Sequence, residues 1–325
     1  MKLPRRKFLN LAASSAALTA LSRISGAQAY PSRAVRIIVG GPPGGPTDIA
    51  ARLISQWLSA RLGQPFVVDN RPGAGGNIAA EAVVRAPADG YTLLLVYASS
   101  AINATLYERL DFNFIRDIAP VASINRTPLV LEVHPSFPAK SVPELIAYTK
   151  ANPGAVNLAL PVIGSGPYMA GELFKMMAGV NMVSVAYRGS GPMLNDLLGN
   201  QVQVAFDGVL SSIQHIRAGR LRALGVASAA RLEALPDIPI IADFVPGFEA
   251  TGWNGIGVPR NTSVEIVDRL NKEINAGLVD PNIKARLADL GTTPLISSSA
   301  EFGRFIADET EKWAKVVKFS GVKPE

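Results

Sequence analysis

Residues 35–48 read Val-Arg-Ile-Ile-Val-Gly-Gly-Pro-Pro-Gly-Gly-Pro-Thr-Asp, and this stretch decides the fold. The aliphatic run at 35–39 predicts a buried strand, and the glycines and prolines that follow predict a tight loop. Thr47 and Asp48 then open an amphipathic stretch that reaches Leu62 and predicts a helix. A strand, a tight loop and a helix in this order form the building unit of an α/β fold.

The same unit recurs along the chain. A strand at 66–69, a glycine-rich loop at 72–76 and a helix at 77–85 lead into a buried strand at 92–97. A second series begins near Pro128 and alternates in the same way, which predicts a second α/β core. Its strands are expected at 129–133, 156–160, 183–186, 202–206 and 221–227.

One more strand, at 253–258, precedes three helical stretches at 263–278, 281–290 and 299–317. No strand is predicted among these helices, so we expect them to cover the first sheet. The chain would then cross between two domains near residues 127 and 251. We predict an α/β fold in which each domain is a doubly wound, mainly parallel sheet flanked by helices. Domain 1 comprises 30–127 plus 252–325, and domain 2 comprises 128–251.

The composition excludes several classes of chemistry. The 325 residues contain no cysteine, which removes disulfides, thiol nucleophiles, cysteine zinc sites and iron–sulfur clusters. The two histidines, His134 and His215, offer little for a metal centre, and we expect both to be structural or solvated. No metal and no cofactor is expected.

Residues 1–29 have the pattern of an export signal peptide. A cationic head is followed by an apolar stretch at 8–21, and Ala27-Gln28-Ala29 predicts cleavage after Ala29. The pair Arg5-Arg6 is typical of twin-arginine export, and an ordinary secretory leader is the alternative. This segment accounts for most of the net charge of +6, because it leaves 27 basic and 26 acidic residues in the mature chain. We therefore expect a periplasmic, soluble protein with no nucleic-acid partner.

Four glycine-rich loops each follow a predicted strand and precede a predicted helix, at 40–46, 72–76, 164–167 and 187–191. Open α/β folds bind ligands at the carboxyl ends of their strands, where helix N-termini present free N–H groups. Such N-termini favour anions, so the four loops together predict an anionic or carboxylate ligand. Any single loop is as well explained by turn chemistry alone.

No motif of nucleotide binding or hydrolysis is complete. Residues 40–48 lack the Lys-Ser/Thr of a P-loop, and neither Ser165 nor Ser190 lies in a Gly-x-Ser-x-Gly elbow. We therefore predict no enzyme and no catalytic residue. Asp207 ends a strand at the expected ligand edge, where it could hold a ligand or only cap the next helix. Arg188 could pair with a carboxylate or lie on the surface.

Several motifs in series resemble one family. They are Pro42-Pro43-Gly44-Gly45-Pro46-Thr47-Asp48, Asn70-Arg71-Pro72-Gly73-Ala74-Gly75-Gly76-Asn77, Ala88-Asp89-Gly90-Tyr91-Thr92-Leu93, Gly164-Ser165-Gly166-Pro167 and Gln201-Val202-Gln203-Val204-Ala205-Phe206-Asp207. They look like the Bug-type receptors (TctC-like) of tripartite tricarboxylate transporters, and the resemblance covers the whole mature chain.

The resemblance implies a type II periplasmic binding protein (Venus flytrap) that closes around one small organic acid and delivers it to membrane permease subunits. It implies a monomer whose ligand is a mono- or dicarboxylate, aromatic acids included. One departure stands at Gly41, where the family often has a larger residue, and this could enlarge the pocket. The ligand-binding residues that the resemblance implies are Gly44, Gly45, Pro46, Thr47, Asp48, Ala74, Gly75, Gly76, Asn77, Ser165, Gly166, Arg188, Gly189, Ser190 and Asp207.

Two other functions remain open on the sequence. Two domains joined by two crossovers predict a cleft between them, and this cleft could equally serve a ligand-sensing subunit of a membrane signalling system, because the partner surface has no readable signature. An exported enzyme acting on a small carboxylate is the other alternative, although the chain shows no nucleophile–base pair.

Overall fold

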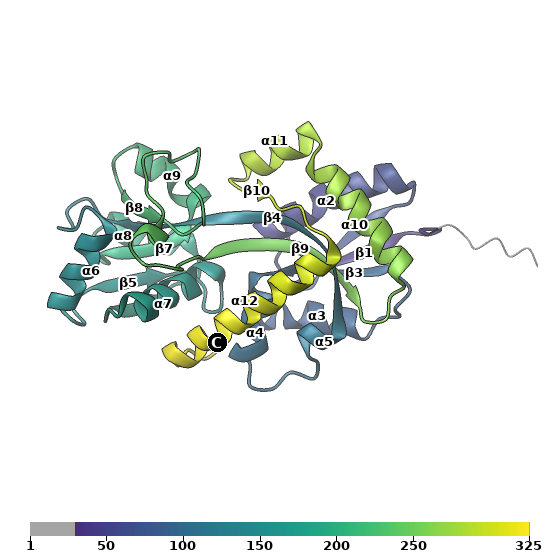
Figure 1. Cartoon of the computed structure of the whole chain (residues 1–325), viewed down its shortest axis with the longest axis horizontal. Helices are drawn as coiled ribbons and strands as arrows, with labels where there is room; N and C mark the ends of the chain where they lie inside the picture. The colour runs from purple at the N-terminus through teal and green to yellow at the C-terminus, as the bar shows by residue number, and fades with distance from the viewer. Residues whose placement is uncertain (1–29, 325) are drawn as a thin grey trace, which may run out of the picture.

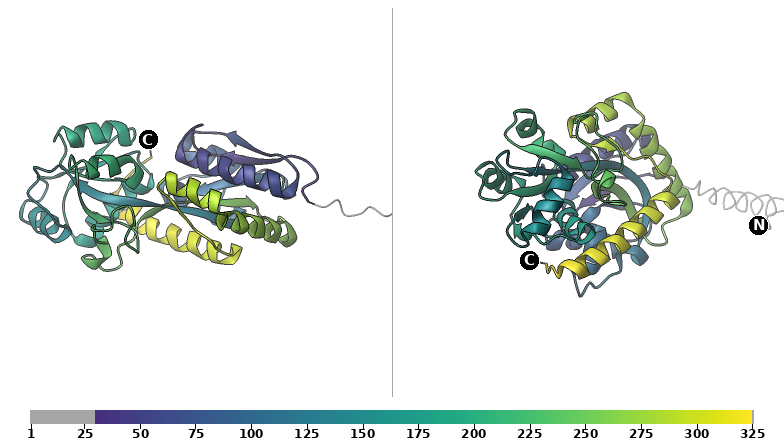
Figure 2. Two further views of the ribbon diagram at one scale, coloured as in Figure 1. Left: turned by 90° about the horizontal axis from the view of Figure 1, so that it is seen from above. Right: turned by 60° about the vertical axis from the view of Figure 1, so that its left-hand side comes forward.

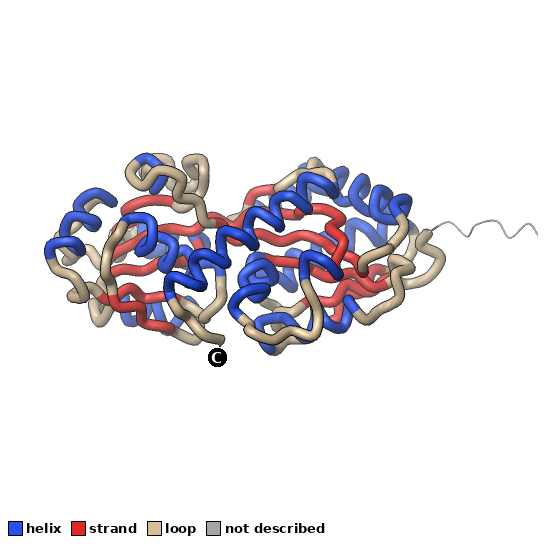
Figure 3. Tube along the Cα trace, turned by 60° about the horizontal axis from the view of Figure 1, so that its bottom comes forward, coloured by secondary structure: helices blue, strands red, loops and turns tan. Residues whose placement is uncertain are grey.

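The computed structural model describes residues 30–324, and the predicted signal peptide lies outside this range. The chain forms two α/β halves that are joined through one sheet (Figure 1). The strand order is β2-β1-β3-β9-β4-β7-β5-β6, with β8 and β10 also pairing with β4. Figure 3 shows the strands running through both halves with the helices on the outside. The predicted α/β fold class is confirmed.

The first half contains the N-terminal and C-terminal parts of the chain. Its strands are β1 (Val35–Val39), β2 (Phe66–Asn70), β3 (Thr92–Tyr97), β9 (Thr251–Pro259) and the short β10 (Thr293–Pro294). Its helices are α2 (Pro46–Leu62), η2 (Ala74–Gly76), α3 (Asn77–Val84), α4 (Ala98–Leu106), α5 (Phe114–Asp117), α10 (Val264–Leu278), α11 (Pro281–Asp289) and α12 (Ser299–Ser320).

The second half lies between β4 (Ile118–Val133) and β9 in the sequence. Its strands are β5 (Asn157–Leu160), β6 (Val183–Ala186), β7 (Val204–Gly208) and β8 (Arg222–Val226). Its helices are α6 (Val142–Ala151), α7 (Gly166–Ala178), α8 (Ser190–Leu198), α9 (Val209–Arg217) and η3 (Ile241–Asp243). The alternation of strands and helices predicted for both halves is therefore present.

The long strand β4 joins the halves and departs from the expected parallel pattern. It pairs antiparallel with β9 as far as Pro128 and antiparallel with β7 and β8 from Leu129 onward. The parallel pairs are β1 with β2 and β3, and β5 with β6 and β7. The sheet is thus mixed, because the strands that carry the chain from one half to the other run against their neighbours. The domain boundaries predicted from the sequence stay a prediction.

The hydrophobic core is continuous on one face of the sheet and divided on the other. On the α12 side, one cluster runs from Ile38 and Ile102 in the first half, through Trp253, to Phe174 and Phe206 in the second half. On the opposite face, the cluster between α2 and α10 is separate from the two clusters under α8 and α9. The two halves therefore share apolar burial on one side only.

Helix α12 contributes to this shared side, which corrects one expectation. It was predicted to cover the first sheet, and it does pack on α4 and β4, but it also contacts α7 of the second half. Figures 1 and 2 show α12 in yellow, lying across the junction. The short strand β10, which pairs with Asn125 and Arg126 of β4, was also not predicted.

Residues 30–324 lack two features, a membrane-spanning helix and a cluster of metal-binding side chains. No helix within this range is both long and apolar enough to cross a bilayer. The same residues contain no group of three or more His, Asp or Glu side chains that could hold a metal ion.

Candidate functional site

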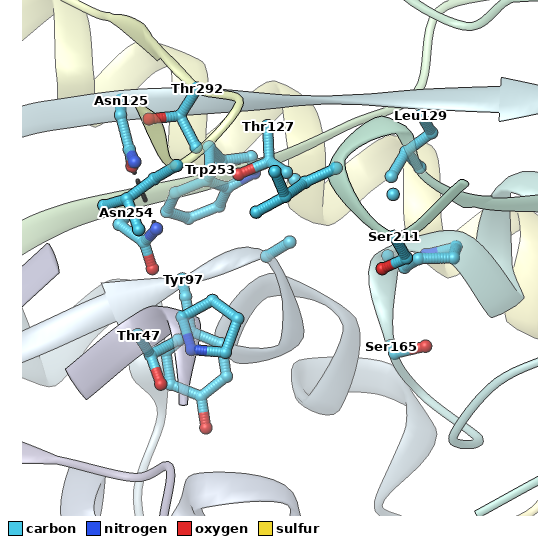
Figure 4. Close-up of a pocket in the computed structure, with 18 of the residues that line it drawn as sticks. Thr47, Tyr97, Asn125, Thr127, Leu129, Ser165, Ser211, Trp253, Asn254 and Thr292 are labelled. Carbon is cyan, nitrogen blue, oxygen red and sulfur yellow. Dashed lines mark hydrogen bonds between the residues drawn. The ribbon is translucent and has the colours of Figure 1, made fainter. Parts of the chain in front are cut away.

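A cavity of about 420 Å³ lies between the two halves, and we call it the main cavity. Its size is in the range of small-molecule sites, roughly 300–1,000 Å³. Strands β4 and β9 form one wall with Asn125, Thr127, Leu129, Trp253 and Asn254. The loops that begin helices form most of the rest, together with Leu290 and Thr292 after α11. Figure 4 shows these side chains around the cavity. The predicted cleft between two α/β halves is therefore present.

Five helices begin at the main cavity. The first residues of α2, α4, α7 and α8 line it, as do Gly208, Leu210 and Ser211 at the start of α9. Each helix N-terminus carries unpaired N–H groups and a partial positive charge of about half a unit. Since these ends converge on one space, the backbone itself favours a negatively charged ligand there.

The side of the main cavity that belongs to the first half carries neutral polar groups. Asn254 donates through Nδ2 to Oδ1 of Asn125 at 2.9 Å, and both side chains are buried. The amide NH₂ of Asn125 is then the group of that side chain left to donate to a ligand. Thr47 and Tyr97 lie across from this pair (Figure 4). Burial raises the pKa of Tyr97 to about 12, so its hydroxyl stays protonated.

The side that belongs to the second half carries a carboxylate. Asp207 is only 1% exposed, and Ser190 donates from Oγ to its Oδ1 at 2.6 Å. Its other oxygen, Oδ2, is buried without a hydrogen-bond partner. Burial raises the pKa of Asp207, while the nearby donors of Ser190, Gly208 and Ser211 act in the opposite direction. Among the described residues that line the main cavity, Asp207 alone has a charged side chain.

A second buried carboxyl group lies next to this side, away from the cavity wall. Glu132 on β4 is fully buried, and Ser212 of α9 donates to its Oε1 at 2.7 Å. Burial raises the pKa of Glu132 to about 8, the Ser212 bond opposes this shift, and the charge of Asp207 adds to it. Glu132 could not be singled out from the sequence, because it lies within a predicted strand.

Asp48, which was predicted to bind ligand, is buried beside the cavity and is not part of its wall. Its Oδ2 accepts from the backbone N–H of Gly44 at 2.9 Å and from Nε of Arg52 at 2.8 Å. Burial raises the pKa of Asp48, but hydrogen bonds from Arg52, Gly44 and Asn70 outweigh it, and the net shift is downward. Asp48 thus holds the Gly44 loop in place.

The loop at 74–77 lies at a second cavity of about 410 Å³. Ala74, Gly75 and Gly76 line this space, and Tyr97 and Ser165 border both cavities. Asn103 holds the loop by donating to the carbonyl of Gly75 and to Oδ1 of Asn77, each at 3.0 Å. The predicted ligand-binding residues that line a cavity are therefore divided between two neighbouring ones, and Asn77 lines neither.

Gly41 also lines the second cavity, and the loops at both cavities depend on glycine. A Cβ atom at Gly41 would collide with Oγ1 of Thr47, so the side chain of Thr47 occupies that space. Gly76 has φ of +97°, and a Cβ atom there would collide with the hydroxyl of Tyr97. Gly76 requires glycine because its φ is positive, whereas a side chain at position 41 would only require the side chain of Thr47 to move.

The remaining predicted site residues separate into two groups. Gly44, Pro46, Thr47, Ser165, Gly166, Ser190 and Asp207 line the main cavity. Gly45 is the N-cap of α2, and Gly189 is the N-cap of α8, with φ of +145°. Arg188 is exposed, and neither it nor Gly189 is part of the wall of the main or the second cavity.

Sequence reasoning missed the wall formed by β4, namely Asn125, Thr127 and Leu129, together with Asn254 of β9. The first half of β4 was not predicted as a strand, and its register against β9 decides that Asn125 lies opposite Asn254. Ser99 was also missed. Its Oγ donates to the carbonyl of Gly164 at 3.0 Å, a hydrogen bond between the two halves.

Comparison with known proteins places the chain in a family. The model of the tripartite tricarboxylate transporter family receptor matches residues 50–322. Protein BugT of Bordetella pertussis is 39% identical over 300 residues, which are 91% of this chain and 92% of BugT.

Solved structures agree with this match. R. palustris Rpa4515 with adipate has 38% identity and a TM-score of 0.77, over 91% of this chain and 100% of that one. MatC (Rpa3494) from Rhodopseudomonas palustris with bound malate has 30% identity and a TM-score of 0.73, over 89% of this chain and 100% of that one. The two-domain binding-protein fold and the resemblance to Bug-type receptors are thereby confirmed. The chain belongs to the receptor family of the tripartite tricarboxylate transporters.

Proposed function

We propose that this protein is an extracytoplasmic receptor that binds a small organic acid in the main cavity and delivers it to the permease subunits of a tripartite tricarboxylate transporter. The observation that carries the proposal is the convergence of five helix N-termini on one cavity between two halves. This arrangement binds a carboxylate through backbone N–H groups, without a lysine or arginine.

The binding residues follow from the cavity. On the first-half side, Gly44, Pro46 and Thr47 lie at the start of α2, and Ser165, Gly166, Ser190 and Asp207 face them from the second half. Adipate in Rpa4515 and malate in MatC support a carboxylate as the ligand class. We propose that Gly45, Asp48, Gly189 and Arg188 act on the loops and not on the ligand.

The loop at 74–77 takes part if the ligand extends past Tyr97 into the second cavity. We propose this for longer acids, since Tyr97 and Ser165 border both spaces. The receptor would act in the periplasm after cleavage near Ala29, as a monomer made of domain 1 (30–127 plus 252–325) and domain 2 (128–251). Ligand would stabilise the closed arrangement by touching both domains.

Two measurements test this proposal. Native mass spectrometry of the freshly purified protein should reveal a co-purified organic acid, unchanged in mass after release. Isothermal titration calorimetry with adipate, malate, benzoate and glutamate should give at least one Kd below about 1 mM, which is about −4 kcal/mol of binding free energy. If no acid co-purifies and none binds at that level, the proposed function is wrong. Turnover of a bound acid would instead indicate an enzyme.

A further inference from the structure

Helix α12 carries a buried acid, Glu309, whose side chain is 9% exposed. Its Oε2 accepts from Nε1 of Trp253 at 3.0 Å and from Nε1 of Trp313 at 2.9 Å. Its Oε1 pairs with the ammonium of Lys312. Both oxygens therefore have partners, and three donors fix the orientation of the carboxylate.

One of these donors belongs to the wall of the main cavity. Trp253 and Asn254 of β9 lie in this wall (Figure 4). Trp253 is 2% exposed, and its ring meets the rings of Phe302 and Phe305 of α12 edge-on, with centroids 5.9 Å and 5.3 Å apart. The wall at Trp253 is thus built on α12, and the position of Asn254 depends on the same anchor.

The same helix holds both strands that connect the halves. Lys312 donates from Nζ to the carbonyl of Glu249, two residues before β9, at 3.2 Å. The side chain of Glu249 accepts from Nη1 of Arg126 at 2.9 Å, and Arg126 lies on β4 opposite Trp253 in the register of the two strands. The guanidinium of Arg126 also lies 5.3 Å from the centre of the Phe305 ring. Strands β4 and β9 are therefore both attached to α12 beside the cavity wall.

Stability alone is a weak reason for a carboxylate at this position. Apolar residues of similar size often stabilise a buried site as well as a charged group does. The carboxylate supplies direction instead, because a buried indole N–H needs an acceptor and Glu309 satisfies that of Trp253 in one orientation.

On the basis of the proposed function, we infer that Glu309 is a positioning residue for ligand binding. It holds the side chain of Trp253, and with it the β9 wall, in the arrangement that the organic acid requires. Glu309 is not part of the wall of the main or the second cavity, so it acts on the acid only through Trp253.

Indole N–H signals in NMR spectra test the anchor without any ligand. The chain has three tryptophans, and the third, Trp57, donates to the carbonyl of Glu273 at 2.7 Å and is the internal reference. In Glu309→Leu the signals of Trp253 and Trp313 should shift, and their hydrogen exchange should become at least about tenfold faster, whereas Trp57 stays as in the wild type. Glu309→Gln keeps an acceptor oxygen and should restore most of this protection.

Isothermal titration calorimetry tests the effect on binding, with adipate, malate, benzoate, glutamate and any acid identified by co-purification. Glu309→Leu should weaken binding of the tightest of these acids at least about fivefold, and Glu309→Gln should recover the affinity to within about twofold of the wild type. Because Glu309 acts through Trp253, adding Glu309→Leu to Trp253→Phe should weaken binding further by less than about twofold.

Trp313→Phe is the matched control. It removes the other indole donor from the same oxygen of Glu309, but Trp313 is not part of either cavity wall. This variant should lower the melting temperature measured by circular dichroism and keep the affinity within about twofold of the wild type. If Glu309→Leu does not fold, Glu309→Asp replaces it, since the shorter side chain withdraws the oxygens from both indoles, and the same weakening is expected.

Unchanged affinity in Glu309→Leu overturns the inference, makes Glu309 a structural residue and leaves the proposed function intact. An unshifted Trp253 signal, an equal loss of affinity in Trp313→Phe, or an additive loss in the double variant also overturns it. If none of the acids binds the wild type and no acid co-purifies, the proposed function fails and the inference fails with it.

Discussion

Asp48 and Asp207 lie in similar places, one on each side of the main cavity. Each is buried near the start of a helix that follows a strand, and each accepts a hydrogen bond from a neighbouring loop or helix. They differ in their partners. Asp48 has Arg52 one helical turn away and a lowered pKa, whereas Asp207 has no cation and a raised pKa.

The difference separates a structural carboxylate from one available to a ligand. A buried acid with its own cation and a backbone donor has its charge balanced within the protein and stabilises the loop it holds, although Oδ1 of Asp48, like Oδ2 of Asp207, lacks a hydrogen-bond partner. Asp207 has neither a cation nor a partner for Oδ2, and because it lines the main cavity, a ligand can supply the missing donor. The four predictions below test this comparison through free energies of unfolding, from the largest expected effect to the smallest.

The largest effect concerns Glu132, which is buried without a cation, as Asp207 is. Its pKa of about 8 means that the folded protein keeps a proton that the unfolded chain releases near its ordinary value of 4.5. The stability it contributes is full below about pH 4 and is lost as the pH rises to about 8. Glu132→Gln should avoid this loss of stability. At pH 8 its free energy of unfolding should therefore exceed that of the wild type by an amount on the order of a few kcal/mol.

Urea unfolding at acidic, neutral and mildly alkaline pH measures this effect. The difference in stability between Glu132→Gln and the wild type should grow with pH. A difference that is constant across the range would contradict the assignment of the raised pKa to Glu132.

The next largest effect is a loss of stability when Asp48 is replaced. Asp48→Asn weakens the bonds from Gly44 and Arg52 and should lower the free energy of unfolding by about 1–3 kcal/mol at neutral pH. Because the pKa of Asp48 is lowered, its contribution is present above its unfolded value and is lost as the pH falls through the folded value. The variant and the wild type should therefore converge in acid. Equal stability at neutral pH would show that the pair with Arg52 is not structural.

The effect of pH on stability at Asp207 is the reverse of that at Asp48. Its raised pKa means that the carboxyl group contributes stability below its unfolded pKa and loses it as the pH rises through the folded value. Asp207→Asn should therefore raise the stability of the ligand-free protein at neutral pH, by about 1 kcal/mol. Thermal unfolding without ligand measures this. If the variant were instead destabilised by a comparable amount, Asp207 would be a structural carboxylate, as Asp48 is.

The smallest effect is expected at Arg52, whose side chain is 51% exposed. Arg52→Gln should cost only about 0.5 kcal/mol, as is typical of an exposed pair one helical turn apart. The N–H of Gly44 still donates to Asp48 in this variant. A cost as large as that of Asp48→Asn would mean that the cation, and not the backbone donor, determines the behaviour of Asp48. Urea unfolding of both variants side by side makes this comparison.

The sequence already contained part of this distinction. Arg52 follows Asp48 by four residues in a predicted helix, which is the spacing of an ion pair, so a structural role for Asp48 could have been predicted. No lysine or arginine lies within four residues of Asp207. The sequence therefore shows only that no cation lies nearby in the chain, and both the missing cation and the unpaired Oδ2 become evident from the packing around β7.

The strand-loop-helix units could be predicted because glycine and proline mark their turns. Helix α4 was missed because it follows β3 directly, with no glycine or proline before it, and its Ser, Asn and Thr residues favour helices weakly. The first half of β4 was missed because Pro120 and Pro128 argue against a strand. The side chains that these elements bring to the cavities, such as Asn125 and Ser99, could not be predicted without them.

The core on the α12 side has a mechanical consequence. Helix α12 has 22 residues, which makes it about 33 Å long, and its contacts extend from α4 to α7. Separating the halves on this side would expose shared apolar surface, whereas the divided cores on the opposite face impose no such cost. The two halves should therefore separate by a hinge rotation about the α12 side. The gap between them should open between α9 and α11. Leu210 and Gly291, which meet across that gap, would be the first contact to break and the last to form.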